Sequence, residues 1–583
     1  MRVVIATVEG ITGMDVGAIF DFHDFLLDQA RVDVDGPLFG QQKDPARQLK
    51  RKSVAVMDRL TANFGDRSQH IAYYDILSRW GCTSTTRLRS KTHAFRRGGI
   101  TYLRDRLRER GAHHFDMLHT LLQHGRWKSV SSLNIYLTVD DKRVLELFDG
   151  TGNGAKLVSD VVELPPAAAT DNDEAQYVLQ TYGRARNDVV FVRGEGCHLV
   201  DAEGRRYLDM AAGIAVNVLG HSDPGWVKSV RDQAGELCHV SNLYHTPQQA
   251  TLARKLCESS FADRVFFCNS GAEANEGAIK FARKYARLRT NFDANWEQGL
   301  LDKILRRGPP TKFVSFERSF HGRTMGALQL TYKKQYKTPF APLMAGGTES
   351  LPFGDLDAVA RTLRSGNVAG VFVEPVQGEG GVLASDAAFL KGLRELCDET
   401  GALLIFDEVQ CGLGRCGALW AHQTYDVEPD ILTTAKPLAG GLPIGAVLMK
   451  QKVADAMSAG DHGSTFAGGP LVCAAANYVF DTVSAPAFLS EVQRKGDALQ
   501  TKLRAKLEGI PGVVEVRGRG LLVGVQLDRP AGPVCESMRT ESNVLAITAG
   551  AGDVLRLVPP LIISDAEIDT AVDAVAKAVT ATA

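Results

Sequence analysis

From about residue 176 to the C-terminus, short apolar runs alternate with helical patterns along the chain. The runs at 264–268, 311–317, 368–375 and 402–406 have the length and composition of buried strands. Because strands that alternate with helices build parallel sheets, the pattern predicts an α/β fold with a mostly parallel sheet.

The chain before residue 160 has a different character. Residues 87–110 hold nine Lys or Arg against two acids, which forms a local basic block. Residues 161–176 contain paired prolines with small and acidic residues that bury little surface, which is typical of a linker. The sequence therefore predicts a segment 1–160, a linker 161–176 and a second part 177–583.

Composition excludes several classes of function. The 583 residues are too many for one ordinary domain, and the net charge of -1 predicts no whole-chain attraction to nucleic acid or anionic membranes. No apolar run reaches the roughly 18 residues of a membrane span. The ten cysteines contain no C-x-x-C pair, so we expect reduced thiols in an intracellular protein, with neither a disulfide framework nor a metal site.

Two apolar runs each end in a residue whose side chain can take part in catalysis. The run 402–406 ends in Asp407, and the run that begins at Ile431 ends in Lys436. Pyridoxal phosphate chemistry needs such a pair, because a lysine holds the cofactor as a Schiff base and a carboxylate keeps the pyridine nitrogen protonated. Taken singly, each residue is better explained as a surface lysine or a strand-end carboxylate.

A phosphate site is predicted where the strand 264–268 leads into a helix. Ser270, with Glu273 three residues later, has the signature of a capping box. The amides of Gly271 and Ala272 would then point out of a helix N-terminus, where the helix dipole favours an anion. A plain strand-to-helix turn explains the same residues.

Three further segments carry candidate ligands. Phe320 offers a ring that can stack on a planar cofactor, and Arg323 a guanidinium that can pair with a carboxylate. Glu379 lies in a glycine-rich loop after the strand 368–375, where α/β sheets bind ligands. Taken alone, Phe320 is explained as a core residue, Arg323 as a solvated side chain and Glu379 as a loop acid.

The last part of the chain adds hydroxyls and a cation. Ser464 and Thr465 lie in a polar, glycine-rich segment whose hydroxyls can bind phosphate or carboxylate, although a solvent loop is the default explanation. Arg556 stands within an apolar strand, where its charge is costly unless a carboxylate pairs with it.

Together these motifs resemble the class III, fold-type I aminotransferases over about residues 177–580. The resemblance implies a large cofactor domain at about 230–450 and a smaller α+β domain built from 177–229 and 451–583. It is carried by the segments 219–224, 239–248, 269–275, 320–324, 374–381, 407–410, 435–441 and 463–466.

The resemblance implies roles by position. Lys436 would be the Schiff-base lysine and Asp407 the partner of the pyridinium. Thr465 would reach the phosphate of a neighbouring subunit, so a homodimer with shared active sites is expected. The other cofactor contacts would be Ser270, Gly271, Ala272, Phe320, Val409 and Gln410, and the substrate contacts Arg323, Ser464, Glu379 and Arg556.

The resemblance also implies an activity. We expect transamination of N2-acetyl-L-ornithine with 2-oxoglutarate, which yields N-acetyl-L-glutamate 5-semialdehyde and L-glutamate in arginine biosynthesis. Ornithine and 4-aminobutyrate are alternative donors. The family implies a mitochondrial or chloroplast location, or a cytoplasmic one if the protein is bacterial-like, although no targeting peptide is readable.

The N-terminal part resembles the catalytic end of a tyrosine recombinase (phage integrase), and a mostly helical fragment is expected. Arg96 would clamp a phosphate, His124 or Trp127 would support it, and Tyr136 would attack. The first catalytic arginine of that family has no match here, so the alternative is an inert remnant, or a fusion that exists only in the gene model. Nucleic-acid binding is therefore an alternative function and not the main expectation.

Overall fold

The computed structural model describes residues 176–182, 189–290, 309–343 and 347–582. All of them belong to one compact unit, residues 171–583. The expectations for the recombinase-like segment 1–160 and for the linker before residue 176 lie outside the described residues.

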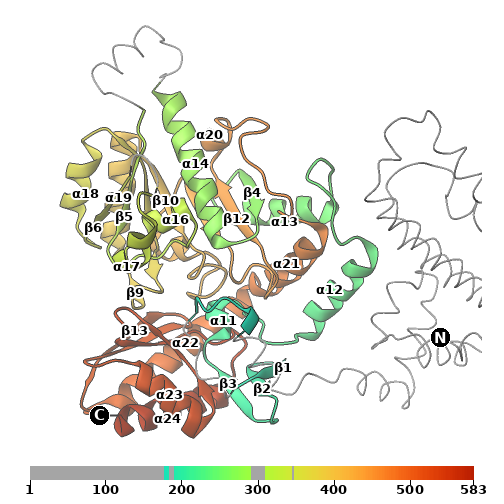
Figure 1. Ribbon diagram of the computed structural model, residues 1–583, viewed down its shortest axis with the longest axis vertical. Coiled ribbons are helices and arrows are strands. Elements are labelled where there is room, and N and C mark those ends of the chain that lie inside the picture. Colours follow the sequence, from blue (N-terminus) through green and yellow to red (C-terminus); the bar gives the residue numbers. More distant parts are fainter. Residues whose placement is uncertain (1–175, 183–188, 291–308, 344–346, 583) are drawn as a thin grey trace, which may run out of the picture. The chain divides into compact units, whose positions relative to one another are not determined.

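A seven-stranded sheet forms the centre of the larger part of the fold (Figure 1). All neighbouring strands pair in parallel except β12, which is antiparallel to both of its neighbours. The alternating pattern therefore produces the mostly parallel sheet that the sequence predicts. In spatial order the strands are β4 (Arg264–Cys268), β12 (Gly445–Met449), β11 (Ile431–Thr434), β10 (Leu403–Asp407), β7 (Val368–Val373), β5 (Lys312–Phe316) and β6 (Thr348–Leu351).

Helices cover both faces of this sheet (Figure 1). On one face α14 (Gly271–Arg289) packs in a cluster that includes Leu403 and Ile405 of β10. On the other face α18 (Leu356–Leu363) and α19 (Ala387–Thr400) pack in a cluster that includes the alternate residues of β10. Burial on both faces explains why these strands are continuously apolar.

The ends of the parallel strands bring candidate residues to one edge. Asp407 ends β10 and is paired in register with Thr433 of β11, three residues before Lys436. Glu374 follows directly after β7, which is the other neighbour of β10. Ligands bind at this edge in open α/β sheets, so the topology positions the site.

A second, antiparallel sheet carries Arg556. Its strands lie in the order β13 (Val513–Arg519), β14 (Leu522–Leu527), β17 (Val554–Leu557) and β16 (Ile547–Ala549). Arg556 stands opposite Gly524 of β14, where the absence of a side chain leaves room for Val382 of the larger part. Three helices complete this part, α22 (Pro486–Leu507), α23 (Gly532–Ser542) and α24 (Asp565–Ala581).

A third sheet joins distant parts of the sequence. Its order is β1 (Phe191–Glu195), β2 (His198–Asp201), β3 (Arg206–Asp209) and β15 (Val544–Leu545), with β15 parallel to β3. Other elements of the described chain are α11 (Ala212–Ala215), α12 (Pro224–Glu236), α13 (Pro247–Glu258), α16 (Met325–Leu330), α17 (Lys334–Lys337), η3 (Thr338–Phe340), β8 (Val376–Gln377), β9 (Leu383–Ala384), η4 (Ala421–Tyr425), α20 (Gln451–Ala454) and α21 (Pro470–Val483).

Within the described residues, no single helix has the length and apolar character that crossing a membrane requires. Only α21 and α22 together reach that length and composition, and they meet at a bend of 70°. Many apolar side chains of α21, including Val479 and Phe480, pack in the largest core cluster.

Candidate active site

Asp407 is the centre of a buried hydrogen-bond network. Its Oδ2 accepts hydrogen bonds from Asn275 Nδ2 at 2.8 Å and pairs with His321 Nδ1 at 2.8 Å, and its Oδ1 accepts one from the Val409 amide at 3.0 Å. Burial acts to lower the pKa of His321, but the hydrogen bond with Asp407 and the charge of that carboxylate raise the pKa overall. These partners fix the orientation of the carboxylate.

The sequence pattern indicates no role for Asn275 or His321. Asn275 also donates to the His321 carbonyl at 2.7 Å and accepts from Thr433 Oγ1 at 2.8 Å, so it ties α14 to β11. The available signal was a polar residue between Ala274 and Ala278 on the apolar face of α14. A buried amide in such a place needs partners.

Lys436 lies two residues beyond β11 and is partly buried. Burial lowers the pKa of its ammonium group, and the charge of Asp407 acts in the opposite sense. Arg556 lowers the pKa further, whereas Glu379 and Glu374 raise it. The amine is therefore surrounded by charges of both signs, and its neutral form is favoured relative to a lysine in water.

Glu374 is a buried carboxylate that the sequence did not single out. It accepts hydrogen bonds from the Phe320 amide at 3.1 Å and the Gly378 amide at 3.4 Å. Burial raises its pKa to about 7, the charge of His321 lowers it, and that of Asp407 raises it. Its position directly after β7 was the only signal in the sequence.

The N-terminus of α14 has the capping residue that the sequence predicts, with one difference. Ser270 Oγ accepts a hydrogen bond from the Glu273 amide at 3.1 Å. The Glu273 carboxylate reaches back to Asn269, whose amide and side chain donate at 3.0 and 2.9 Å, and so it does not close the predicted box on Ser270. The Gly271 and Ala272 amides, at the first turn, have no intrahelical acceptor.

Gly271 lies directly against Val409. A Cβ added to Gly271 would come within 2.6 Å of Val409 Cγ1, which is closer than real Cβ atoms approach a neighbour. The first turn of α14 and the residues after β10 are therefore in contact only because position 271 lacks a side chain.

Phe320 and Arg323 lie in the loop that follows β5. Phe320 is half-buried, whereas Arg323 is exposed. The Arg323 guanidinium carbon lies 3.6 Å from the centre of the Tyr336 ring and 5.7 Å from that of Phe320. The cation is therefore stacked on a ring of α17.

Arg556 has the carboxylate partner that its burial requires. Its Nη2 donates to Glu379 Oε1 at 3.1 Å, and its Nη1 donates to Gln410 Oε1 at 3.0 Å. The arginine side chain is 2% exposed and that of Glu379 30%. The pair therefore joins β17 to the loop after β8 and to the residues after β10.

Ser464 and Thr465 differ in their surroundings. Ser464 Oγ accepts a hydrogen bond from Asn269 Nδ2 at 2.8 Å, which brings the loop 461–469 to the N-terminus of α14. Thr465 and the neighbouring Phe466 are exposed.

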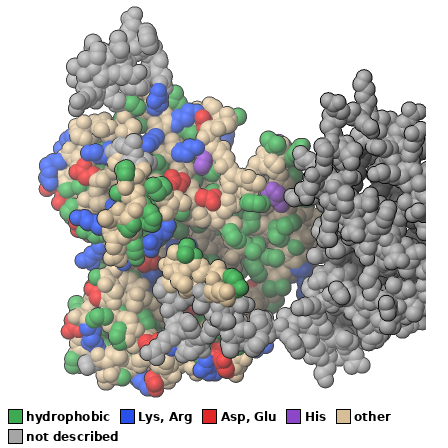
Figure 2. Space-filling model, in the orientation of Figure 1, with side chains coloured by type: hydrophobic (Ala, Val, Ile, Leu, Met, Phe, Trp, Pro, Cys, Tyr) green, Lys and Arg blue, Asp and Glu red, His purple; other side chains and the backbone are tan. Residues whose placement is uncertain are grey.

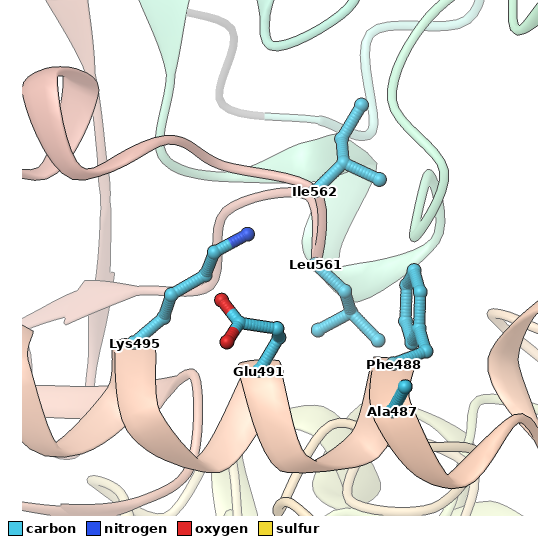
Figure 3. A pocket seen from close by; sticks show the side chains of 6 residues that line it. All are labelled: Ala487, Phe488, Glu491, Lys495, Leu561 and Ile562. Atoms are coloured by element: carbon cyan, nitrogen blue, oxygen red, sulfur yellow. The ribbon is translucent and has the colours of Figure 1, made fainter.

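A separate surface hollow of about 440 Å³ lies on α22 (Figure 3). Phe488 and Leu561 face it from α22 and from the loop before α24, and no predicted site residue lines it. Across the described residues, no group of three or more His, Cys, Asp or Glu could hold a metal ion.

Comparison with known proteins places the chain in a family. The sequence pattern of the family described as aminotransferase class-III matches residues 181–579. The chain belongs to the class III aminotransferases. It is therefore an aminotransferase, and like its family it depends on pyridoxal 5′-phosphate (PLP).

Several relatives of this aminotransferase are similar over most of its length. It is 52% identical to "Acetylornithine aminotransferase, mitochondrial" of Alnus glutinosa over 414 residues, which cover 70% of this chain and 88% of that protein. It is 43% identical to "Acetylornithine aminotransferase" of Methanocaldococcus jannaschii over 401 residues, or 69% of this chain and 95% of the relative.

Solved structures show the same fold. The ornithine aminotransferase of Toxoplasma gondii is 32% identical with a TM-score of 0.65, covering 74% of this chain and 98% of that chain. The N-acetylornithine aminotransferase of Stenotrophomonas maltophilia is 35% identical with a TM-score of 0.57, covering 70% and 98%.

The described residues fit PLP. A carboxylate oriented by several donors at Asp407 suits a protonated pyridine nitrogen, and the first amides of α14 suit a phosphate. The partly buried Lys436 offers an amine with a lowered pKa for covalent attachment. Gly271 lets the first turn of α14 lie against Val409, a close approach that a larger side chain would prevent.

Proposed function

We propose that this aminotransferase transfers the δ-amino group of N2-acetyl-L-ornithine to 2-oxoglutarate. The products are N-acetyl-L-glutamate 5-semialdehyde and L-glutamate. The observation that carries the proposal is the 52% identity with the Alnus glutinosa protein named as an acetylornithine aminotransferase. The archaeal relative of the same name supports it.

Ornithine is the alternative donor. The ornithine aminotransferase of Toxoplasma gondii has the higher TM-score of the two solved structures, whereas the curated relatives with the higher identities are named for acetylornithine. Backbone similarity reports a fold that many substrates share, while the choice of substrate depends on particular side chains. Sequence identity therefore weighs more here, and 4-aminobutyrate ranks third.

We assign the cofactor contacts by position and chemistry. In this proposal Lys436 Nζ attaches PLP covalently and the Asp407 carboxylate accepts a hydrogen bond from the pyridinium. When bound, PLP supplies an electron sink for the carbanion that amino-group transfer generates. The other proposed contacts are Ser270, Gly271 and Ala272 to the phosphate, Phe320 and Val409 to the ring faces, and Gln410 toward the ring hydroxyl.

Lys436 is also the proposed base. Its Nζ, once free of the cofactor, takes the proton from Cδ of the donor. Only the neutral amine can do this, and burial supports that form by lowering the pKa of Lys436. Two half-reactions that use one amine in turn imply ping-pong kinetics.

The substrate carboxylates are assigned to two arginines. Arg323, with Ser464, contacts acetylornithine in this proposal. Arg556 remains paired with Glu379 while the acetylornithine amine is bound, and it is released to bind a carboxylate of 2-oxoglutarate. The hydrogen bond between Arg556 and Glu379 at 3.1 Å supports the masked state.

We further propose a homodimer with shared active sites. Leu243, Tyr244 and Phe466 are 85, 68 and 68% exposed, and Asn242 donates to the carbonyls of Ser464 and Ala467, which links these two loops. Figure 2 shows hydrophobic side chains gathered around α12, α13 and α21 on the face in view. An apolar surface beside Thr465 supports the expectation that this residue serves a neighbouring subunit.

The test is a steady-state comparison of three donors with 2-oxoglutarate as acceptor. We expect kcat/KM to be highest for acetylornithine, ahead of ornithine and 4-aminobutyrate. A preference for ornithine by roughly tenfold, equal to about 1.4 kcal/mol in transition-state binding, would make ornithine the substrate. Sedimentation analysis of the same sample tests the homodimer.

Residues 1–160 carry a different hypothesis. The recombinase-like positions Arg96 and Tyr136 support DNA binding as an alternative function of the full chain. Duplex binding that weakens steeply with salt, and that disappears when residues 1–160 are removed, would establish it. Negligible DNA binding by both the full chain and the shortened protein would leave amino-group transfer as the function.

The compartment is also a proposal. The Alnus glutinosa relative is named as mitochondrial, which supports the mitochondrial alternative among the expected locations. Imaging of a C-terminal fluorescent fusion of the full chain tests it.

A further inference from the structure

Arg323 is exposed but is held in place. Its guanidinium carbon lies 3.6 Å from the centre of the Tyr336 ring, at stacking distance, and the Phe320 ring centre is 5.7 Å away on the loop that carries the arginine. Across the described residues no hydrogen bond or ion pair engages Arg323. The ring contact therefore orients the cation and leaves its five N–H donors available.

The ring belongs to a short, cationic element. Tyr336 lies on α17, and its amide donates to the Lys333 carbonyl at 3.1 Å. The Lys333 ammonium lies 5.7 Å from the same ring. Burial lowers the pKa of Lys337, and the positive charge of Lys334 lowers it further. The surroundings of Arg323 are therefore positive and favour an anionic ligand.

An aromatic ring can orient Arg323 without occupying its N–H donors, whereas an acidic side chain cannot. An acidic partner would neutralise Arg323 and compete with a substrate carboxylate for its N–H groups. A ring restricts the flexible arginine side chain and leaves its planar set of N–H donors free. Preorganisation of this kind improves affinity because less order has to be imposed on binding.

We infer that Tyr336 is a positioning residue that sets the specificity for a carboxylate-bearing donor. It stacks on Arg323 so that the guanidinium presents its donors to the α-carboxylate of the substrate. The inference rests on the proposed function, in which Arg323 contacts acetylornithine. Tyr336 does not touch the reacting atoms, so its removal weakens donor binding and leaves the chemical step intact.

The experiment compares Tyr336→Leu with Tyr336→Phe in the full-length holoenzyme. The probe is N-acetyl-L-norvaline, which has the acetamido group and α-carboxylate of the donor but no δ-amine, and its carboxamide is the control ligand. Removing the ring raises Kd for the carboxylate probe about 2- to 5-fold, because a cation–π contact at an exposed site contributes roughly that factor. Tyr336→Phe keeps the wild-type Kd.

Kinetics separate a positioning role from a structural one. In Tyr336→Leu, KM for acetylornithine rises by the same factor as Kd while kcat stays within about twofold. In an Arg323→Met background, Tyr336→Leu adds no further loss, because the two residues act on one contact. Additive losses, equal losses in the Phe and Leu variants, or an unchanged Kd in Tyr336→Leu would each overturn the inference.

Failure of the proposed function is distinguishable from failure of this inference. The former appears in the wild-type enzyme, as turnover of another donor in place of acetylornithine. The latter appears only in the comparison among Tyr336 variants. Since ornithine and 4-aminobutyrate also carry a carboxylate, the same double-mutant cycle is run on whichever donor the wild-type enzyme prefers.

Discussion

The Nδ1 atom of His321 lies 2.8 Å from Oδ2 of Asp407, and both side chains are buried. The Nε2 atom of the same ring has no partner among the described residues. The imidazole therefore uses its one hydrogen bond to hold the carboxylate that is proposed to face the cofactor.

Replacing His321 by Leu removes that hydrogen bond. A hydrogen bond to a charged group contributes about 1.5–3 kcal/mol, so we expect the affinity for PLP to fall by roughly 10-fold or more. Titration of the apoenzyme with PLP, followed by fluorescence, measures the effect. The control is His198→Leu. His198 lies on β2, in a different sheet from Asp407, and its Nδ1 is 3.5 Å from Oε1 of Glu567. Equal PLP affinity in the two variants would contradict the role of His321.

Lys436→Ala is expected to abolish transamination and to leave the chain folded, because the residue lies beyond the end of β11 and is only partly buried. The direct readout is covalent attachment. Borohydride reduction of the wild-type holoenzyme followed by mass spectrometry should place the cofactor on the peptide that contains Lys436. Reduced cofactor on another lysine of the wild-type chain would show that the assignment is wrong.

The charges around Lys436 predict opposite shifts in the pH dependence of the donor half-reaction. The neutral amine is the base, so the rate rises with pH through the pKa of Lys436, which burial lowers. Glu374 raises that pKa, so Glu374→Gln moves the rise in rate to lower pH. Arg556 lowers the pKa of Lys436, so Arg556→Met moves the rise in rate to higher pH.

Single-turnover rates with acetylornithine alone measure these shifts, because 2-oxoglutarate is absent and its proposed contact with Arg556 plays no part. Glu374→Gln also removes a carboxyl group whose pKa is about 7. Shifts of the same sign in the two variants would refute the electrostatic account.

Gly271→Ala tests the close approach of α14 to the residues after β10. The new Cβ would lie 2.6 Å from Val409 Cγ1, and overpacking of this kind costs about 1–3 kcal/mol. We expect a loss of PLP affinity of roughly 10-fold. Gly235→Ala on α12 is the matched control, because its Cβ meets nothing within 4 Å and alanine favours a helix. Equal PLP affinity in the two proteins would show that the close approach of Gly271 to Val409 does not matter for cofactor binding.

The sequence by itself was sufficient for the features that depend on local pattern. Continuous apolar runs predicted strands buried on both faces, and β7 and β10 are such strands. The residue that ends β10 was readable as Asp407, because the end of an apolar run marks the end of a buried strand. Ser270 was readable as a helix cap for the same local reason.

Tertiary structure alone decided which buried groups are partners. Asn275 and Asp407 are 132 residues apart in sequence, and His321 and Asp407 are 86 apart, so no local pattern indicates these contacts. Likewise, the stacking of Tyr336 on Arg323 depends on how α17 returns over the loop after β5. A buried polar group must find a partner, but the packing of helices on the sheet determines which one, and that packing is a property of the whole fold.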